Sequence, residues 1–284
     1  MMQDVLVFGS AGMAGHVICE YLEELGKYNI IRCARSSGSE ENVMVVDVRN
    51  PESVKSSLKE VKPDIVINCA GLLIQASEER IDEAVLVNSY VPQYLAWLGR
   101  EQKFKLIHLS TDCIFSGEKG GYVESDRGDG CNAYARTRAL GEVVSEDHLT
   151  IRTSFVGPEL KSDGSGLFGW FMQQKGEISG FSNAFWSGVT TLELSKFIDA
   201  AIEADLRGLY QLTAPNKISK FELLNYLKDA WQKDDVVIKK HDNAFSDKSL
   251  VSTRTDFQWQ VSEYPTMFNQ LKVWMDSHPE LYKA

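Results

Sequence analysis

Three glycines spaced three residues apart, Gly9, Gly12 and Gly15, constrain the fold of this chain more than any other feature. They form the stretch GSAGMAG, which follows the apolar run 4–9 and opens the amphipathic stretch 13–27. A strand that turns into a helix through closely spaced glycines brings its backbone near a pyrophosphate, and the helix start offers free N–H groups and a positive dipole potential. The motif therefore predicts a dinucleotide site at the first strand–helix junction of an α/β fold.

The rest of the N-terminal half alternates short apolar runs with longer amphipathic stretches. Strands are expected at 29–34, 43–48, 64–71, 104–111 and 149–154, and helices at 51–61, 77–102 and 132–146. Pro92 lies inside the expected helix 77–102 and is a candidate kink. Strands with nearly continuous apolar interiors that alternate with helices indicate a parallel sheet covered on both faces. The sequence thus predicts a doubly wound parallel Rossmann sheet.

The pattern becomes less regular after residue 156. A loop is expected at 157–166, helices at 191–204 and 219–232, and a strand at 208–213. We therefore expect an NAD(P)-binding Rossmann domain over residues 1–156, with a return segment near 187–213, and a small α/β C-terminal lobe over 157–284. The charged stretch 232–243 predicts only exposed surface.

Charge and cysteine content exclude several classes of protein. The net charge of −10 and the pI of about 5.1 argue against non-specific binding to nucleic acid or to an anionic membrane surface. No apolar run is long enough to span a bilayer, and the N-terminus lacks the pattern of a signal peptide. The five cysteines are scattered and the five histidines lack ligand spacing. We expect a cytoplasmic protein without nucleic-acid, membrane or metal partners.

Residues that follow the second and third expected strands bear on the choice of dinucleotide. Arg35 and Ser36 stand where an NAD site commonly carries an acidic residue. A guanidinium beside a hydroxyl suits a 2′-phosphate, so NADPH is favoured over NADH unless Arg35 is simply solvated. Asp47, followed by Val48, can accept a hydrogen bond from the adenine amino group, or it is an ordinary strand-end aspartate.

Several stretches together resemble the extended short-chain dehydrogenase/reductase superfamily and, within it, the dTDP-4-dehydrorhamnose reductase group. They are GSAGMAG, DIVINCAG (64–71), Asn88, LIHLSTDCIFSGEKGGYVESD (106–126), YARTRALGE (134–142), IRTSFVGP (151–158) and FWSGVTTLELSKFI (185–198). The resemblance implies a Rossmann body with a substrate-binding lobe. It also implies NAD(P)H-dependent reduction of a 4-keto-6-deoxy nucleotide sugar in deoxysugar and surface polysaccharide biosynthesis, such as that of dTDP-rhamnose. A homodimer is a candidate assembly.

The resemblance also implies roles for three residues. Thr111 matches the catalytic serine or threonine and Tyr134 the catalytic tyrosine. Arg138, one helical turn after Tyr134, stands where the group nearly always has a lysine that holds the nicotinamide ribose and lowers the tyrosine pKa. Arginine keeps the charge but is effectively never deprotonated, so it could stabilise a tyrosinate but not relay a proton. The alternative is that Arg138 marks an NADP-binding regulatory subunit without turnover.

The implied reaction is hydride transfer to C4, with Tyr134 as proton donor and Thr111 bonded to the same oxygen. Cofactor contacts are expected from Gly9, Ala11, Gly12, Met13, Ala14, Gly15, Arg35, Ser36, Asp47, Val48, Cys69, Ala70, Gly71, Asn88, Tyr134 and Arg138. Substrate contacts are expected from Thr111, Asp112, Cys113 and Trp186, with packing as the alternative for Cys113 and Trp186. Arg152 is expected to pair with a structural carboxylate.

A nucleotide-sugar epimerase is an enzymatic alternative to the reductase. Dehydratase chemistry is disfavoured, because Asp112 and Cys113 stand where an Asp-Glu pair is expected.

Overall fold

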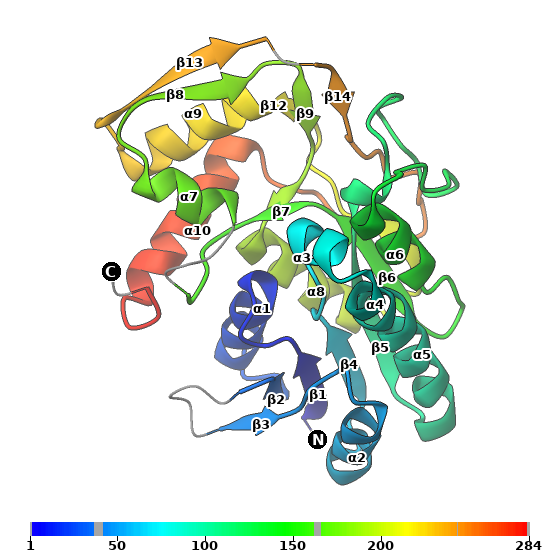
Figure 1. Ribbon diagram of the computed structural model, residues 1–284. Helices are drawn as coiled ribbons and strands as arrows, with labels where there is room; N and C mark the ends of the chain where they lie inside the picture. Colours follow the sequence, from blue (N-terminus) through cyan, green and yellow to red (C-terminus); the bar gives the residue numbers. More distant parts are fainter. Residues whose placement is uncertain (1, 37–41, 162–165, 243, 283–284) are drawn as a thin grey trace.

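A seven-stranded parallel sheet forms the body of the computed structural model, which describes residues 2–36, 42–161, 166–242 and 244–282 (Figure 1). The strand order is β11-β6-β5-β4-β1-β2-β3. The strands are β1 Gln3–Phe8, β2 Tyr28–Ala34, β3 Val43–Val45, β4 Ile65–Asn68, β5 Lys105–Thr111, β6 Leu149–Thr153 and β11 Gly208–Gln211. All neighbouring pairs run parallel, and the order reverses between β1 and β4. The predicted doubly wound Rossmann fold is confirmed.

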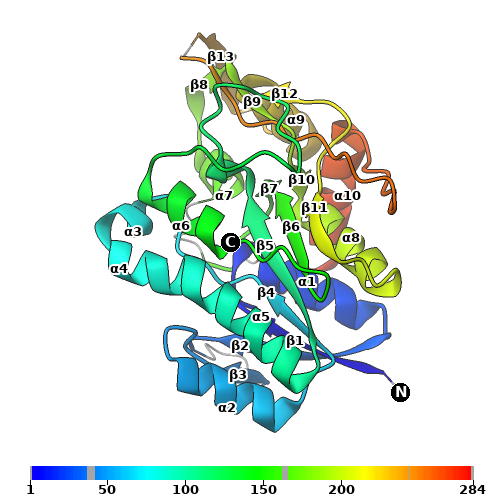
Figure 2. The same ribbon diagram turned by 90° about the vertical axis from the view of Figure 1, so that its right-hand side faces the viewer.

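Helices cover both faces of this sheet (Figure 2). They are α1 Met13–Glu24 and α8 Thr191–Glu203 on one face, and α2 Pro51–Val61, α5 Val91–Gln102 and α6 Ala133–Gly141 on the other. Side chains of β1 alternate between the two layers: Val5 and Val7 join the cluster that includes Ile18 of α1, whereas Leu6 joins the one that includes Leu58 of α2. This alternation follows from the two-residue period of a strand.

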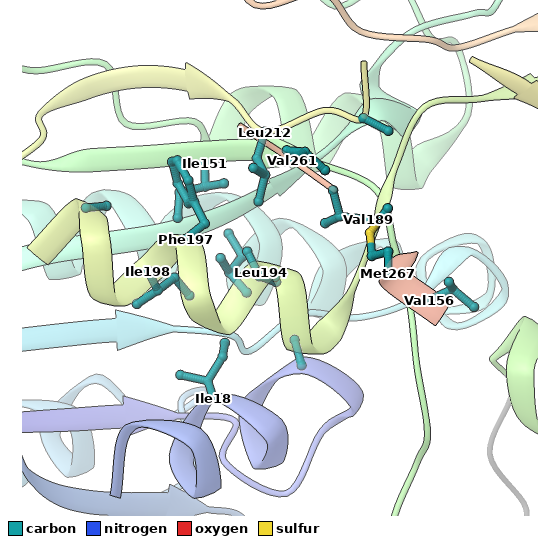
Figure 3. Packing of buried hydrophobic residues seen from close by; sticks show 14 of the residues in the cluster. Ile18, Ile151, Val156, Val189, Leu194, Phe197, Ile198, Leu212, Val261 and Met267 are labelled. Atoms are coloured by element: carbon teal, nitrogen blue, oxygen red, sulfur yellow. The ribbon is translucent and has the colours of Figure 1, made fainter. Parts of the chain in front are cut away.

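The segment that contains α8 and β11 returns the chain to the body. In Figure 3, Phe197 of α8 lies near Ile151 of β6, and Ile18 of α1 lies on the other side of α8. β11 then extends the sheet by pairing with β6. The strand expected at 208–213 therefore forms, as the seventh strand of the central sheet.

The single helix expected over 77–102 is interrupted. Its place is taken by α3 Ile74–Glu79, α4 Ile81–Ala84, the π-helical segment η1 Val85–Tyr90, and α5. The break between α3 and α4 falls at Arg80, whose φ of −134° and ψ of 70° are not helical. Pro92 lies in the first turn of α5, where its missing N–H interrupts least. The irregularity lies before the proline, in η1, where the wider π-helical turn carries Asn88.

Short strands and the helices α7, α9 and α10 make up the C-terminal lobe, at the top and left of Figure 1. They are β7 Phe155–Val156, α7 Leu167–Gln173, β8 Gly176–Phe181, β9 Ala184–Trp186, β10 Val189–Thr190, β12 Ile218–Ser219, α9 Lys220–Trp231, β13 Val236–His241, β14 Ser246–Asp247 and α10 Tyr264–Ser277. The strands form the small sheets β10-β7, β12-β9-β14 and β13-β8. Residues 236–241, expected only as charged surface, thus form a paired strand. The domain boundary at residue 156 stays a prediction.

The loop after β5 is tied to the lobe, as the two segments lying side by side in Figure 1 show. The N–H of Asp247 donates to the carbonyl of Gly117 at 2.7 Å, and the N–H of Tyr122 donates to the carbonyl of Ser249 at 2.9 Å. Gly120 has a φ of +70°, and a Cβ there would overlap the Asp247 carboxylate. Glycine at this position permits the close approach that joins the two segments.

Candidate active site

The glycine loop at the end of β1 leaves open the space that a pyrophosphate needs. Gly9 has a φ of +78°, and a Cβ there would lie 2.9 Å from the backbone nitrogen of Ala70. A Cβ on Gly15 would overlap the Gly9 carbonyl oxygen, whereas a Cβ on Gly12 would approach only that oxygen, at 3.2 Å. Gly12 is the N-cap of α1 and offers no side chain to the first-turn N–H groups. These N–H groups and the open space fit a dinucleotide phosphate.

The remaining loop residues differ in exposure. Ala11 is exposed, Met13 is half-buried and Ala14 is buried. Their backbone N–H groups, rather than their side chains, are what this loop could offer to a phosphate.

Sequence reasoning missed a second arginine, Arg49, at the adenosine end of the candidate site. This end consists of Arg35, Ser36, Asp47 and Val48. Arg35 and Ser36 are exposed after β2, and Val48 is buried. Arg49 binds both carboxylate oxygens of Asp47, with Nη2 2.7 Å from Oδ2. The hydrogen bonds from Arg49 hold the pKa of Asp47 below its usual value, and the charge of Arg35 lowers it further. Arg35 and Arg49 therefore both act on Asp47, and Arg49 is paired with it.

Asn88 forms hydrogen bonds with the loop after β4. Cys69 and Ala70 are half-buried and Gly71 is exposed. The Asn88 amide oxygen accepts from the N–H of Leu72 at 2.8 Å, while its nitrogen lies 3.3 Å from the Leu72 carbonyl and from Thr137 Oγ1. Asn88 is fully buried and its hydrogen bonds go to the protein. It positions the loop, and a direct contact between Asn88 and a cofactor stays a prediction.

Thr111 and Tyr134 come together where β5 ends and α6 begins. Thr111 Oγ1 accepts from the N–H of Cys113 at 3.1 Å. Asn132 caps α6 by accepting from the N–H of Ala135 at 2.7 Å, which places Tyr134 in the first turn. Burial raises the pKa of Tyr134, while the charge of Arg138 and a hydrogen bond with Thr111 lower it. The charge of Arg138 lowers the pKa of Tyr134, as predicted. The expectation that the pKa lies below its ordinary value is wrong, because the effect of burial is larger.

Arg138 is buried and spans the gap between β5 and the Gly71 loop. It is 7% exposed, and its Nη2 donates to the carbonyl of Leu109. A Cβ on Gly71 would lie 3.0 Å from its Nη1. Its Nε has no hydrogen-bond partner among the described residues. The longer side chain of arginine fits here because residue 71 has none.

A histidine that sequence reasoning missed lies in the same buried layer. His108 of β5 is 1% exposed, and its Nδ1 lies 3.2 Å from the amide nitrogen of Asn68. Burial, aided by the charge of Arg138, lowers the pKa of His108 far below its usual value. The imidazole is therefore neutral, and Arg138 keeps the only positive charge of this pair.

Asp112 and Cys113 lie at the end of the site that faces the lobe. Asp112 is 5% exposed, and its pKa is raised by burial and lowered by the charges of Lys220 and Lys248. Burial raises the pKa of the Cys113 thiol to about 12, so this thiol is neutral. Both remain predicted substrate contacts.

Lys220, the first residue of α9, was missed by sequence reasoning. Its Nζ lies 5.2 Å from the centre of a Trp186 ring, and burial lowers the pKa of Lys220 while Asp112 raises it. The only local signal is the capping box of Ser219 and Glu222 before it, which marks a helix start but gives no position relative to Asp112.

Trp186 is packed into the core of the lobe. It is 2% exposed, its Nε1 donates to Ser154 Oγ at 2.8 Å, and its ring lies 5.6 Å from that of Tyr264. These contacts favour the packing alternative, and a contact between Trp186 and a sugar stays a prediction.

Arg152 pairs with a structural carboxylate, as predicted. Its Nε and Nη2 donate to the two Glu142 oxygens at 2.9 and 2.7 Å, and both side chains are largely buried. An open hollow of about 570 Å³ lies over this pair, and none of the predicted site residues lines it.

A family model described as the RmlD substrate binding domain matches residues 2–251. The chain belongs to this family. The chain is similar to the spore coat polysaccharide biosynthesis protein SpsK of Bacillus subtilis, with 31% identity over 162 residues that cover 55% of this chain and 54% of SpsK. The probable low-salt glycan biosynthesis reductase Agl14 of Haloferax volcanii is 34% identical over 161 residues, covering 53% and 52%. The chain thus spans about half the length of these curated relatives.

Solved structures show the same fold. A crystal structure of dTDP-4-dehydrorhamnose reductase from Bacillus anthracis in complex with NADP is 20% identical, with a TM-score of 0.81, and covers 96% of this chain and 100% of that one. Within the described ranges, no helix of the RmlD-family chain has the length and apolar character needed to cross a bilayer. The same residues contain no group of three or more His, Cys, Asp or Glu side chains placed to hold a metal ion.

Proposed function

We propose that this chain is an NADPH-dependent reductase of the C4 ketone of a 4-keto-6-deoxy nucleotide sugar, acting in deoxysugar or surface polysaccharide biosynthesis in the cytoplasm. The observation that carries the proposal is the meeting of Thr111 and Tyr134 beside Arg138 and the Gly71 loop. Relatives named dTDP-4-dehydrorhamnose reductase in Escherichia coli and dTDP-4-keto-6-deoxy-D-glucose reductase in Streptomyces niveus support the substrate class.

Residues of this chain would donate the proton that the reduced carbonyl oxygen takes up. A bound nicotinamide cofactor supplies the hydride. Because burial raises its pKa, the Tyr134 phenol is protonated at neutral pH and can donate to the developing alkoxide. Thr111 donates a hydrogen bond to the same oxygen, and the Arg138 charge stabilises the phenolate that remains. Since arginine does not deprotonate, the proton returns to Tyr134 by a route that bypasses Arg138.

A binding subunit without turnover is the second candidate. Its support is that the Arg138 guanidinium uses one of its donors on the Leu109 carbonyl of the protein itself. Retention of both Thr111 and Tyr134 favours the reductase, because a subunit that only binds NADP needs neither.

A homodimer through α5 and α6 is part of the proposal. Tyr90 and Trp97 are each 46% exposed, and Leu140 and Val144 are 67% and 68% exposed. Gln93 of α5 lies three residues after Tyr90, the last residue of η1, and four before Trp97, so the three side chains share one helical face. Gln93 donates to the Leu140 carbonyl at 3.3 Å, which brings this face next to the segment of Leu140 and Val144. A contiguous exposed apolar surface is typical of an association site.

Turnover with defined nucleotide sugars tests the proposal. The purified chain is mixed with NADPH and a dTDP-4-keto-6-deoxy sugar, and nicotinamide absorbance and sugar products are followed. Oxidation of NADPH with the keto sugar, but not with dTDP-glucose, supports the reductase. Binding of NADPH without turnover across a panel of keto sugars supports the binding subunit, and a new stereoisomer without net oxidation supports an epimerase. Failure to bind any dinucleotide overturns all three.

A further inference from the structure

A buried histidine links the glycine loop to the C-terminal end of the described chain. His16, in the first turn of α1, is 1% exposed. Its Nδ1 lies 2.8 Å from the Gly12 carbonyl oxygen, and its Nε2 lies 2.9 Å from the Tyr282 hydroxyl oxygen. A carbonyl only accepts hydrogen bonds, so Nδ1 carries the ring hydrogen and Nε2 accepts from Tyr282. Burial lowers the pKa of His16 to about 4, which keeps this neutral form at physiological pH.

The Gly12 carbonyl is the part of the loop that His16 holds. It accepts from the ring and also from the backbone N–H of His16, at 3.1 Å. The Gly12 carbonyl and the Met13 N–H belong to one planar peptide unit and point in opposite directions. Fixing the carbonyl toward His16 therefore fixes the Met13 N–H away from it. The backbone N–H of His16 already gives this carbonyl its helical hydrogen bond, and the ring adds a second one, which further restricts a peptide unit that glycine leaves flexible.

The C-terminal segment is itself anchored to α1 at two places. The ring of Tyr282 meets that of His16 edge-on, with centroids 5.8 Å apart, and lies 6.1 Å from Trp274. At the other end of α1, His278 Nε2 lies 2.6 Å from a Glu24 carboxylate oxygen. Residues 278 and 282 lie beyond residue 251, where the match to the family model ends. The contact with the loop therefore comes from a part of the chain outside the matched range.

We propose that Tyr282, acting through His16, is a positioning residue that orders the peptide unit between Gly12 and Met13 for the pyrophosphate of the dinucleotide. The inference rests on the proposed function, because it takes the glycine loop as the pyrophosphate site. Dinucleotide affinity then depends on the C-terminal segment through the contact of Tyr282 with His16.

Tyr282→Phe tests the proposal, because it removes the hydroxyl and keeps the ring. We expect the Kd for NADPH to rise about 3- to 10-fold, the scale of one hydrogen bond. Without cofactor, amide hydrogen exchange of residues 9–15 should become faster. His16→Leu should raise the Kd further, and adding Tyr282→Phe to it should have no additional effect.

Glu24→Gln is the matched control, since it weakens the other anchor of the same segment. It should lower thermal stability slightly and leave the NADPH Kd and the exchange of residues 9–15 near their wild-type values. The proposal is overturned if folded Tyr282→Phe keeps both values unchanged, or if Glu24→Gln shifts them equally. A wild type that binds no dinucleotide refutes the proposed function, and the exchange measurement then decides on Tyr282 independently.

Discussion

The two ends of the candidate site differ in how they hold their cations. The nicotinamide end is formed by Thr111, Tyr134, Arg138 and the loop at Gly71, and the adenosine end by the segments after β2 and β3. Arg35 is exposed, and the Arg49–Asp47 pair is more than one-third exposed on each side. Arg138 is 7% exposed and bonded to a strand carbonyl. Exposed pairs are screened and rearrange readily, whereas a buried cation keeps one position. We infer that the adenosine end adapts to the dinucleotide, while the nicotinamide end is arranged beforehand for chemistry.

Tyr134→Phe should have the largest effect and tests whether the nicotinamide end is catalytic. Turnover should fall by about two to four orders of magnitude, the scale for loss of a positioned general acid, with the NADPH Kd nearly unchanged. Because the pKa of Tyr134 is raised above its ordinary value, the wild-type rate should hold from neutral pH through the ordinary ionisation range of tyrosine and fall only at the higher pH where this phenol ionises. Steady-state kinetics across pH measures both, and equal rates for variant and wild type would exclude Tyr134 as the acid.

Gly12→Val should be next in size and tests the loop that joins the two ends. A Cβ at Gly12 meets only the Gly9 carbonyl at 3.2 Å, so the variant should fold, yet its side chain would occupy the pyrophosphate space. We expect dinucleotide affinity to fall by about 100-fold, the scale of a steric cost of 2–3 kcal/mol. Gly15→Val is the matched contrast: its Cβ would overlap the Gly9 carbonyl, so it should lower the melting temperature as well. Undiminished affinity in a folded Gly12→Val protein would exclude this loop.

Gly71→Ala should reduce kcat/KM about tenfold, because its Cβ would lie 3.0 Å from Arg138 Nη1 and displace the guanidinium. Arg138→Lys keeps the charge and shortens the side chain, so this variant should stay active within about tenfold of wild type. In the Arg138→Lys background, Gly71→Ala should have little further effect. A double-mutant cycle of kcat/KM measures the coupling, and additive effects would show that the guanidinium is not fixed against Gly71.

Arg35→Asp should give the smallest effect and tests the adaptable end. It removes a cation and adds a repulsive charge, so the Kd for NADPH should rise about 5- to 10-fold, the scale of one charged hydrogen bond, with little change for NADH. Arg49→Gln is the comparison, because Arg49 already binds Asp47. Titration of both variants with NADPH and with NADH, at two salt concentrations, measures how much each arginine contributes to the affinity for each cofactor. Equal losses of affinity for NADPH and NADH in Arg35→Asp would remove Arg35 from the 2′-phosphate site.

The sequence was sufficient wherever local pattern determines structure. The helix expected at 51–61 has the observed bounds of α2, since a proline at its start and the Asn50 cap define it locally. The strands of the body were found from their apolar runs, and the glycine loop from its spacing. Among site residues, the pairing of Tyr134 with Arg138 follows from helical periodicity alone.

What could not be predicted depends on contacts between distant parts of the chain. β7, β10, β12 and β14 have two residues each, too few to show a period. Lys220 lies near Asp112, and His16 near Tyr282, only because the tertiary fold brings them together. The sign of the Tyr134 shift required knowing how deeply the phenol is buried, which periodicity does not give.

The link between the loop after Thr111 and the segment near Ser249 has a consequence for protein synthesis. Gly117 and Tyr122 bond to Asp247 and Ser249, about 130 positions later. The ribosome releases the N-terminal part first, so β1 to β6 can pair while this loop still lacks its partner. We expect the loop after Thr111 to lack its hydrogen-bond partners in the nascent chain until residues near 250 emerge from the ribosome. Translation itself would then delay activity until residues near 250 have been made and have paired with this loop.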